Sequence, residues 1–133
     1  MLSIKGRSNI VVDESVLACS MRSGSVRVYA TPAMIALMEK TAAESIQPYL
    51  PEGYTSVGTE INITHVAPTP VGMTVNVLSE VTDESENGKI VTFRVQAYDD
   101  VGLIGEGTHK RAIVHRVRFE EKALKKSLAQ ARK

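Results

Sequence analysis

The chain has 133 residues, a formal net charge of +1 and 43% apolar residues, which suits one domain with its own core. The near-neutral charge gives no general attraction to nucleic acid. The single cysteine, Cys19, excludes an intrachain disulfide and argues against a cysteine-based metal site. Because there is no signal-peptide pattern and no apolar run of about 18 residues, we expect a cytoplasmic protein with no membrane or nucleic-acid partner.

The first predicted elements are a short strand over 6–13, another over 26–29 and a helix over 31–47. Thr31 suits the N-cap of that helix, and Pro32 suits its first turn, where a missing N–H costs nothing. Pro48 disfavours helical backbone at the residue before it, so the helix should end near Gln47.

Glu39 lies on the apolar face of this helix. Its neighbours at i−4, i+3, i+4 and i+7 are Ile35, Ala42, Ala43 and Ile46. An ionised carboxylate that faces a core is costly unless it is paired or used. This position therefore marks Glu39 as a candidate functional residue.

Beyond Tyr54 the hydrophobic period changes from about 3.6 to 2, which indicates strands. In 56–66, the residues Val57, Thr59, Ile61, Ile63 and His65 are expected on one face. Further strands are predicted over 73–83, 90–98 and 103–117, with a hairpin turn at 87–88. The order predicts an α+β fold, in which an antiparallel sheet wraps around one long central helix. Such a sheet has free edges, so an edge-to-edge dimer is expected.

His65 would point from an apolar strand face, and we interpret it as a possible partner of Glu39. A Glu–His pair at the edge of a core is a candidate catalytic site. His109 and His115 share a face with Arg111, and we interpret both as half-exposed strand residues. They lack a close third ligand, so no metal site is expected.

The last 15 residues, FEEKALKKSLAQARK, are rich in Lys and Arg. They are expected to form a solvated helix or a frayed tail. An anionic or nucleotide partner is the alternative, because the positive charge is clustered. The predicted organisation is therefore a domain over 1–118 and a basic tail over 119–133.

Several segments together resemble the hot-dog fold, and most closely the fluoroacetyl-CoA thioesterase-like group of acyl-CoA thioesterases. The residues that carry the resemblance are Ala30-Thr31 and the segments 34–53, 56–77, 93–100 and 104–115. The resemblance implies a hot-dog thioesterase that hydrolyses a small or medium acyl-CoA to the free acid and CoA. It implies no cofactor beyond the CoA of the substrate, and a homodimer or dimer of dimers.

The family's functional residues fall on matching positions of this sequence. The resemblance implies catalytic roles for Thr31, Glu39 and His65, and substrate binding by Gly58 and Arg111. Each residue also has a purely structural explanation. Thr31 could cap the helix, His65 could be a hydrogen-bonded core histidine, and Glu39 could pair with a core hydroxyl. Gly58 could relieve crowding between strands, and Arg111 could form an ion pair on the surface. Glu39 would act either as general base or as nucleophile.

Residues 21–29 show no counterpart of the bulky apolar lid of the fluoroacetyl enzyme. The expectation is therefore thioester hydrolysis rather than fluoroacetyl specificity. Two other functions stay open at this point. One is a hot-dog hydratase or dehydratase acting on acyl thioesters, and the other is an acyl-CoA-binding protein without catalysis.

Overall fold

The computed structural model describes residues 1–131 of the chain. Its strands are β1 (Lys5–Val11), β2 (Tyr54–His65), β3 (Thr74–Glu84), β4 (Ile90–Tyr98) and β5 (Leu103–His115). Its α-helices are α1 (Ala18–Met21), α2 (Thr31–Ile46) and α3 (Arg116–Ala131), and two short 3-10 helices are η1 (Glu14–Val16) and η2 (Gln47–Tyr49).

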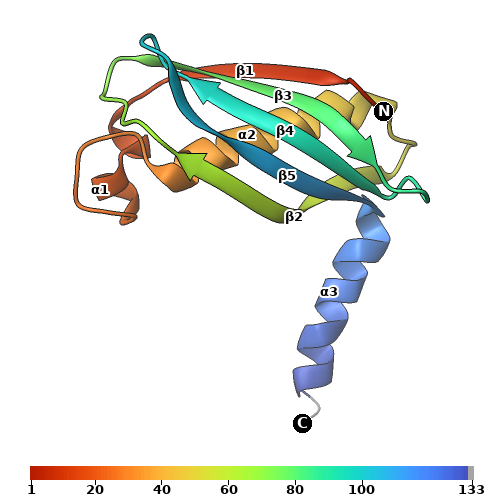
Figure 1. Ribbon diagram of the computed structural model, residues 1–133. Coiled ribbons are helices and arrows are strands. Elements are labelled where there is room, and N and C mark those ends of the chain that lie inside the picture. The colour runs from red at the N-terminus through yellow and green to blue at the C-terminus, as the bar shows by residue number, and fades with distance from the viewer. Residues whose placement is uncertain (132–133) are drawn as a thin grey trace.

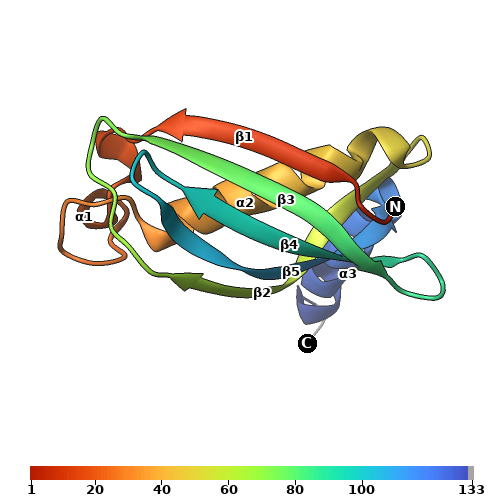
Figure 2. The same ribbon diagram turned by 45° about the horizontal axis from the view of Figure 1, so that its top comes forward.

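The five strands form one antiparallel sheet in the order β1-β3-β4-β5-β2, so β1 and β2 are its edges. The sheet curves around α2, which runs along its concave side (Figure 1). Figure 2 shows α2 behind the strands along most of their length. The predicted architecture, a sheet wrapped around one long helix, is confirmed.

The core lies between α2 and the central strands and is mainly aliphatic. From α2 it takes Met34, Leu37, Met38, Ala42 and Ile46, and from the sheet Val75, Val77, Val91, Phe93 and Val95. These positions alternate along β3 and β4, as expected for strands with one buried face. The core fixes α2 against the sheet and so determines where its remaining face points.

The start of α2 differs from the prediction in one respect. Ala30, not Thr31, occupies the N-cap, and it makes no side-chain capping bond. Thr31 is the first residue of the helix, so its hydroxyl is free for another partner. At the other end the helix stops at Ile46 and continues as the 3-10 turn η2, which contains Pro48.

The segment before α2 also differs from the prediction. The expected strand over 26–29 is wrong, because only an isolated bridge joins Tyr29 to Leu17. Residues 22–27 are exposed instead, while Tyr29 is buried in the core. This segment and α1 stand beside the N-terminal end of α2 (Figure 1).

A β-bulge in β2 changes which residues face α2. Gly58 pairs with Arg111 but Glu60 pairs with Lys110, so one extra residue, Thr59, is inserted there. Because side chains alternate along a strand, the insertion reverses the faces beyond it. The prediction of one shared face from Val57 to His65 is therefore wrong. Ser56 and Gly58 precede the bulge, and Ile61, Ile63 and His65 follow it on that same inner face.

Helix α3 leaves the end of β5 and projects away from the sheet (Figure 1). None of its residues is buried, and its apolar side chains Val117, Phe119, Leu124 and Leu128 are exposed. The first part of the predicted tail is thus helical, whereas Arg132 and Lys133 lie outside the described residues. No helix within 1–131 is long and apolar enough to cross a membrane.

Candidate active site

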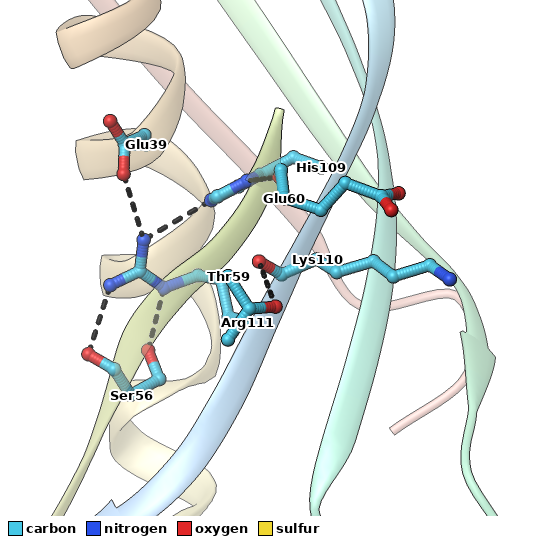
Figure 3. Close-up of polar contacts among 7 residues, drawn as sticks. All are labelled: Glu39, Ser56, Thr59, Glu60, His109, Lys110 and Arg111. Atoms are coloured by element: carbon cyan, nitrogen blue, oxygen red, sulfur yellow. Dashed lines mark hydrogen bonds and ion pairs between the residues drawn. The ribbon is translucent and has the colours of Figure 1, made fainter. Parts of the chain in front are cut away.

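Glu39 faces β2 and β5 from the middle of α2, where it meets a buried guanidinium. Its Oε2 lies 3.6 Å from Nη1 of Arg111. The Glu39 side chain is 39% exposed, whereas that of Arg111 is only 9% exposed. The carboxylate is therefore the more exposed of the two groups, and it faces the buried guanidinium across a single contact (Figure 3).

Arg111 is held by several partners besides Glu39. Its Nε donates to Ser56 Oγ at 2.7 Å, and its Nη2 donates to the Ser56 carbonyl at 2.9 Å. Burial lowers the pKa of Arg111, while the Glu39 charge acts in the opposite direction. An arginine keeps its proton in proteins, so a fixed positive charge lies next to Glu39.

The interpretation of His109 as half-exposed is wrong, because its exposure is 0%. Its Nδ1 lies 2.8 Å from the Glu60 carbonyl, and its Nε2 lies 3.1 Å from Nη1 of Arg111. The ring also stacks on Phe93, with centroids 6.0 Å apart. Burial lowers the pKa of His109, and the Arg111 charge adds to this effect. Alternation along β5 correctly places His109 and Arg111 on one face of the strand. Because both residues are polar, the sequence suggested that this face is exposed.

Gly58 lies opposite Arg111 and directly beside the Glu39 carboxylate. A β-carbon at this position would be 2.6 Å from Glu39 Oε2 and 3.2 Å from His109 Cε1. Only a glycine lets the backbone of β2 come this close to the carboxylate. The structure therefore brings Gly58, Glu39 and Arg111 together. This proximity is what the hypothesis of one site containing all three residues requires.

Thr31 and His65 form a second pair at the N-terminal end of α2. Thr31 Oγ1 lies 2.7 Å from His65 Nδ1. Burial lowers the pKa of His65, which favours the neutral imidazole near pH 7. Its Nε2 is buried and has no partner within the described part of the chain.

Glu39 and His65, which the sequence suggested as a pair, are not paired within this chain. Glu39 contacts Arg111 and His65 contacts Thr31. No Glu39–His65 hydrogen bond or ion pair occurs in the described residues. Eight residues separate Thr31 from Glu39, which is about 12 Å along a helix. The two pairs thus lie along one face of α2, about two turns apart. No cluster of three metal-ligating side chains occurs within residues 1–131.

A cavity of about 360 Å³ adjoins the Thr31–His65 pair. Its walls come from the segment 18–31 and from the turn that follows β2. Tyr29 is one of the wall residues, and its hydroxyl is buried without a hydrogen-bond partner among residues 1–131. Burial raises the pKa of Tyr29 to about 12, so this hydroxyl keeps its proton. A slightly larger hollow of about 440 Å³ lies over β1, β3 and β4, away from all of these residues.

A curved antiparallel sheet wrapped around one long helix defines the hot-dog class of protein, and here polar pairs lie between that helix and a sheet edge. The chain belongs to the family of fluoroacetyl-CoA-specific thioesterases, whose family model matches residues 12–117. The fluoroacetyl-CoA thioesterase of Streptantibioticus cattleyicolor is 43% identical over 102 residues, which cover 77% of this chain and 72% of that protein.

Solved structures agree with this assignment. A structure of the fluoroacetyl-CoA thioesterase has a TM-score of 0.88 and 33% identity, covering 95% of this chain and 96% of that one. A thioesterase superfamily member from Thermus thermophilus has a TM-score of 0.85 and 29% identity, covering 98% and 94%. The predictions of a hot-dog fold, of this family and of an acyl-CoA thioesterase are confirmed.

Proposed function

We propose that this protein hydrolyses a small or medium acyl-CoA to the free acid and CoA, with Thr31, Glu39 and His65 as its catalytic residues. The observation that carries the proposal is the half-exposed Glu39 carboxylate, held by a buried arginine beside the backbone of Gly58. CoA enters as part of the substrate, and the proposed chemistry uses neither a metal nor another cofactor.

Glu39 supplies the negative charge that the reaction needs. As a general base it takes a proton from water, and the hydroxide adds to the thioester carbonyl. The tetrahedral intermediate then collapses and expels the CoA thiolate. As a nucleophile, Glu39 itself adds to the carbonyl, expels the thiolate and forms an anhydride that water cleaves. Both routes require an ionised carboxylate, and the guanidinium of Arg111 lies 3.6 Å from it.

Gly58 and Arg111 are proposed to bind the reacting end of the substrate. The backbone N–H of Gly58 is the proposed donor to the thioester oxygen, where negative charge develops. Arg111 is buried next to the more exposed Glu39 carboxylate, which is the group proposed to act on the thioester. We therefore place its contact near the thioester rather than at the phosphates of CoA.

Thr31 and His65 are proposed to act beside the cavity that holds the acyl group. The 2.7 Å contact fixes the ring of His65 and leaves Nε2 without a partner in the described residues. This nitrogen would orient the attacking water, or take a proton from it and pass that proton to the leaving thiolate. A volume of about 360 Å³ suits a short or medium acyl chain. Its wall includes Ser23 and Gly24, which do not supply a bulky apolar lid.

A homodimer or dimer of dimers is proposed to complete the site. Gly58 and His65 both belong to β2, which is an unpaired edge of the sheet. Ile61 is exposed on this strand, and a second copy paired along β2 would cover it. The exposed apolar side chains of α3 support an association between copies as well. We place the protein in the cytoplasm, where acyl-CoA thioesters are used.

The proposal is tested by measuring CoA release with a thiol reagent over short, branched, aromatic and long acyl-CoAs. Release that is strongest with a short or medium chain is expected. Formation or loss of a carbon–carbon double bond without CoA release would instead indicate a hydratase or dehydratase. Tight binding of acyl-CoAs with no chemical change would indicate a binding protein.

A further inference from the structure

His109 lies outside the set of proposed catalytic residues, yet it is fully buried. Both of its ring nitrogens have polar partners. It faces Arg111 on its own strand, the Glu60 carbonyl on β2 and Phe93 on β4. Glu39 on α2 contacts the same Arg111, and its charge acts on His109. These contacts are drawn in Figure 3 except for the ring of Phe93.

The two partners of His109 fix where its proton sits. A carbonyl oxygen only accepts hydrogen bonds, so Nδ1 must carry the hydrogen that points to Glu60. A guanidinium only donates, so Nε2 must accept from Nη1 of Arg111. The ring is therefore neutral, and a second proton on Nε2 would point at the donor of Arg111.

The same Nη1 atom of Arg111 faces both His109 and Glu39, at 3.1 Å and 3.6 Å. Ser56 holds the opposite edge of the guanidinium through Nε and Nη2. His109 is thus the only side chain in the described residues that accepts a hydrogen bond from the edge pointing at Glu39. Without it, that edge can turn or slide while Ser56 still holds the other side.

We infer that His109 is a positioning residue, which acts through Arg111 to hold the Glu39 carboxylate in place for thioester hydrolysis. The inference rests on the proposed function, because it assigns a purpose to the position of Glu39. The site then has three parts: the partly exposed Glu39, the buried Arg111 that contacts it, and His109 with Ser56 as the partners that hold Arg111.

Two variants of His109 separate positioning from packing. His109→Phe keeps an aromatic ring against Phe93 but removes the acceptor. His109→Gln loses the ring but can direct its amide oxygen to Arg111. We expect kcat to fall between about tenfold and 100-fold in His109→Phe, since small misplacements of reacting groups have effects of this size. The value of KM should stay near that of the wild type, and His109→Gln should recover most of kcat.

The division of the loss between kcat and KM adds a readout that a general packing defect would not give. A displaced Glu39 carboxylate lowers kcat and leaves substrate binding unchanged, whereas a collapsed site changes both constants. His115→Gln, on the same strand but away from Arg111, serves as the control and should match the wild type. Equal losses of kcat in the Phe and Gln variants would overturn the inference.

Nitrogen-15 NMR of the wild type tests the inference without any turnover. The His109 ring is expected to show a protonated Nδ1 and an unprotonated Nε2 at pH 7, with slowly exchanging Arg111 side-chain N–H signals. A protonated Nε2 would overturn the inference. If these signals are as expected but no acyl-CoA is hydrolysed, then the proposed function fails while the support of Arg111 by His109 stands.

Discussion

Gly58 and Glu39 lie so close that a β-carbon on Gly58 would be 2.6 Å from the Glu39 carboxylate oxygen Oε2. This contact joins the middle of α2 to the bulge of β2, and it depends on the absence of one side chain. The bulge matters as well, because it returns Ile61, Ile63 and His65 to the face on which Gly58 lies. Gly58 and His65, which are an odd number of positions apart, can therefore face the same side of the sheet.

Replacing Gly58 with alanine should remove most of the activity while the protein stays folded. The new methyl group must push aside the partly exposed Glu39 carboxylate, and it would also lie 3.2 Å from the buried His109 ring. A stability cost of about 1 to 3 kcal/mol is therefore expected. The fall in kcat should exceed about tenfold. Gly102→Ala is the matched control, because a β-carbon there meets nothing within 4 Å. Similar kcat values for the two variants would refute the close-contact account.

Thr31 offers a test of hydroxyl chemistry that is free of helix capping. Because Ala30 is the N-cap, Thr31→Val should not show the loss of about 1 kcal/mol typical of a removed cap. It should still lower kcat by roughly tenfold or more, because His65 loses its 2.7 Å partner. Thr31→Ser keeps the hydroxyl and should retain most of the activity. The combination to measure is kcat together with the free energy of unfolding in urea.

The unpaired hydroxyl of Tyr29 should contribute nothing to stability in the free protein. It is buried and has no hydrogen-bond partner in the described residues, so Tyr29→Phe should leave the free energy of unfolding unchanged or raise it. Thr41→Val is the contrasting variant, since the Thr41 hydroxyl is buried and donates to the Leu37 carbonyl at 2.7 Å. The free energy of unfolding of Thr41→Val should be lower than that of the wild type by about 1 kcal/mol. A clear loss in Tyr29→Phe would mean that its hydroxyl has a partner after all.

Stability should fall as the pH is lowered below about 6.5. Burial lowers the folded-state pKa of both His65 and His109 from the ordinary value of 6.5. Between 6.5 and those lowered values the unfolded chain binds more protons than the folded one, so acid favours unfolding. Urea unfolding at several pH values should show this decline, and His109→Gln should make it shallower. Stability that rises on acidification through this range would contradict the burial of neutral histidines.

The domain boundary proposed at residue 118 is open to a truncation test. Helix α3 has no buried residue, so a chain ending at residue 118 should fold and unfold at nearly the temperature of the full chain. Light scattering of both forms would show whether the exposed side chains of Leu124 and Leu128 contribute to the proposed dimer. A truncated chain that does not fold would show that the tail belongs to the domain.

Much of this architecture followed from local patterns in the sequence. Helical periodicity placed Glu39 on the face that meets the sheet, and alternation placed β3, β4 and β5 close to their observed limits. The bulge at Thr59 was missed because an inserted residue is visible only in the pairing of β2 with β5. His109 was missed for a related reason: a polar residue on a strand is usually exposed, and only its two buried partners explain its position.

The most direct test of the central claim compares two glutamates of the same helix. Glu39 faces the site, whereas Glu44 is exposed and pairs with Lys40 at 2.7 Å. With the best acyl-CoA found, Glu39→Gln is expected to lower kcat by about 100-fold or more, and Glu44→Gln to leave it unchanged. A folded Glu39→Gln protein that turns over like the wild type would contradict the assignment of Glu39 as the catalytic carboxylate.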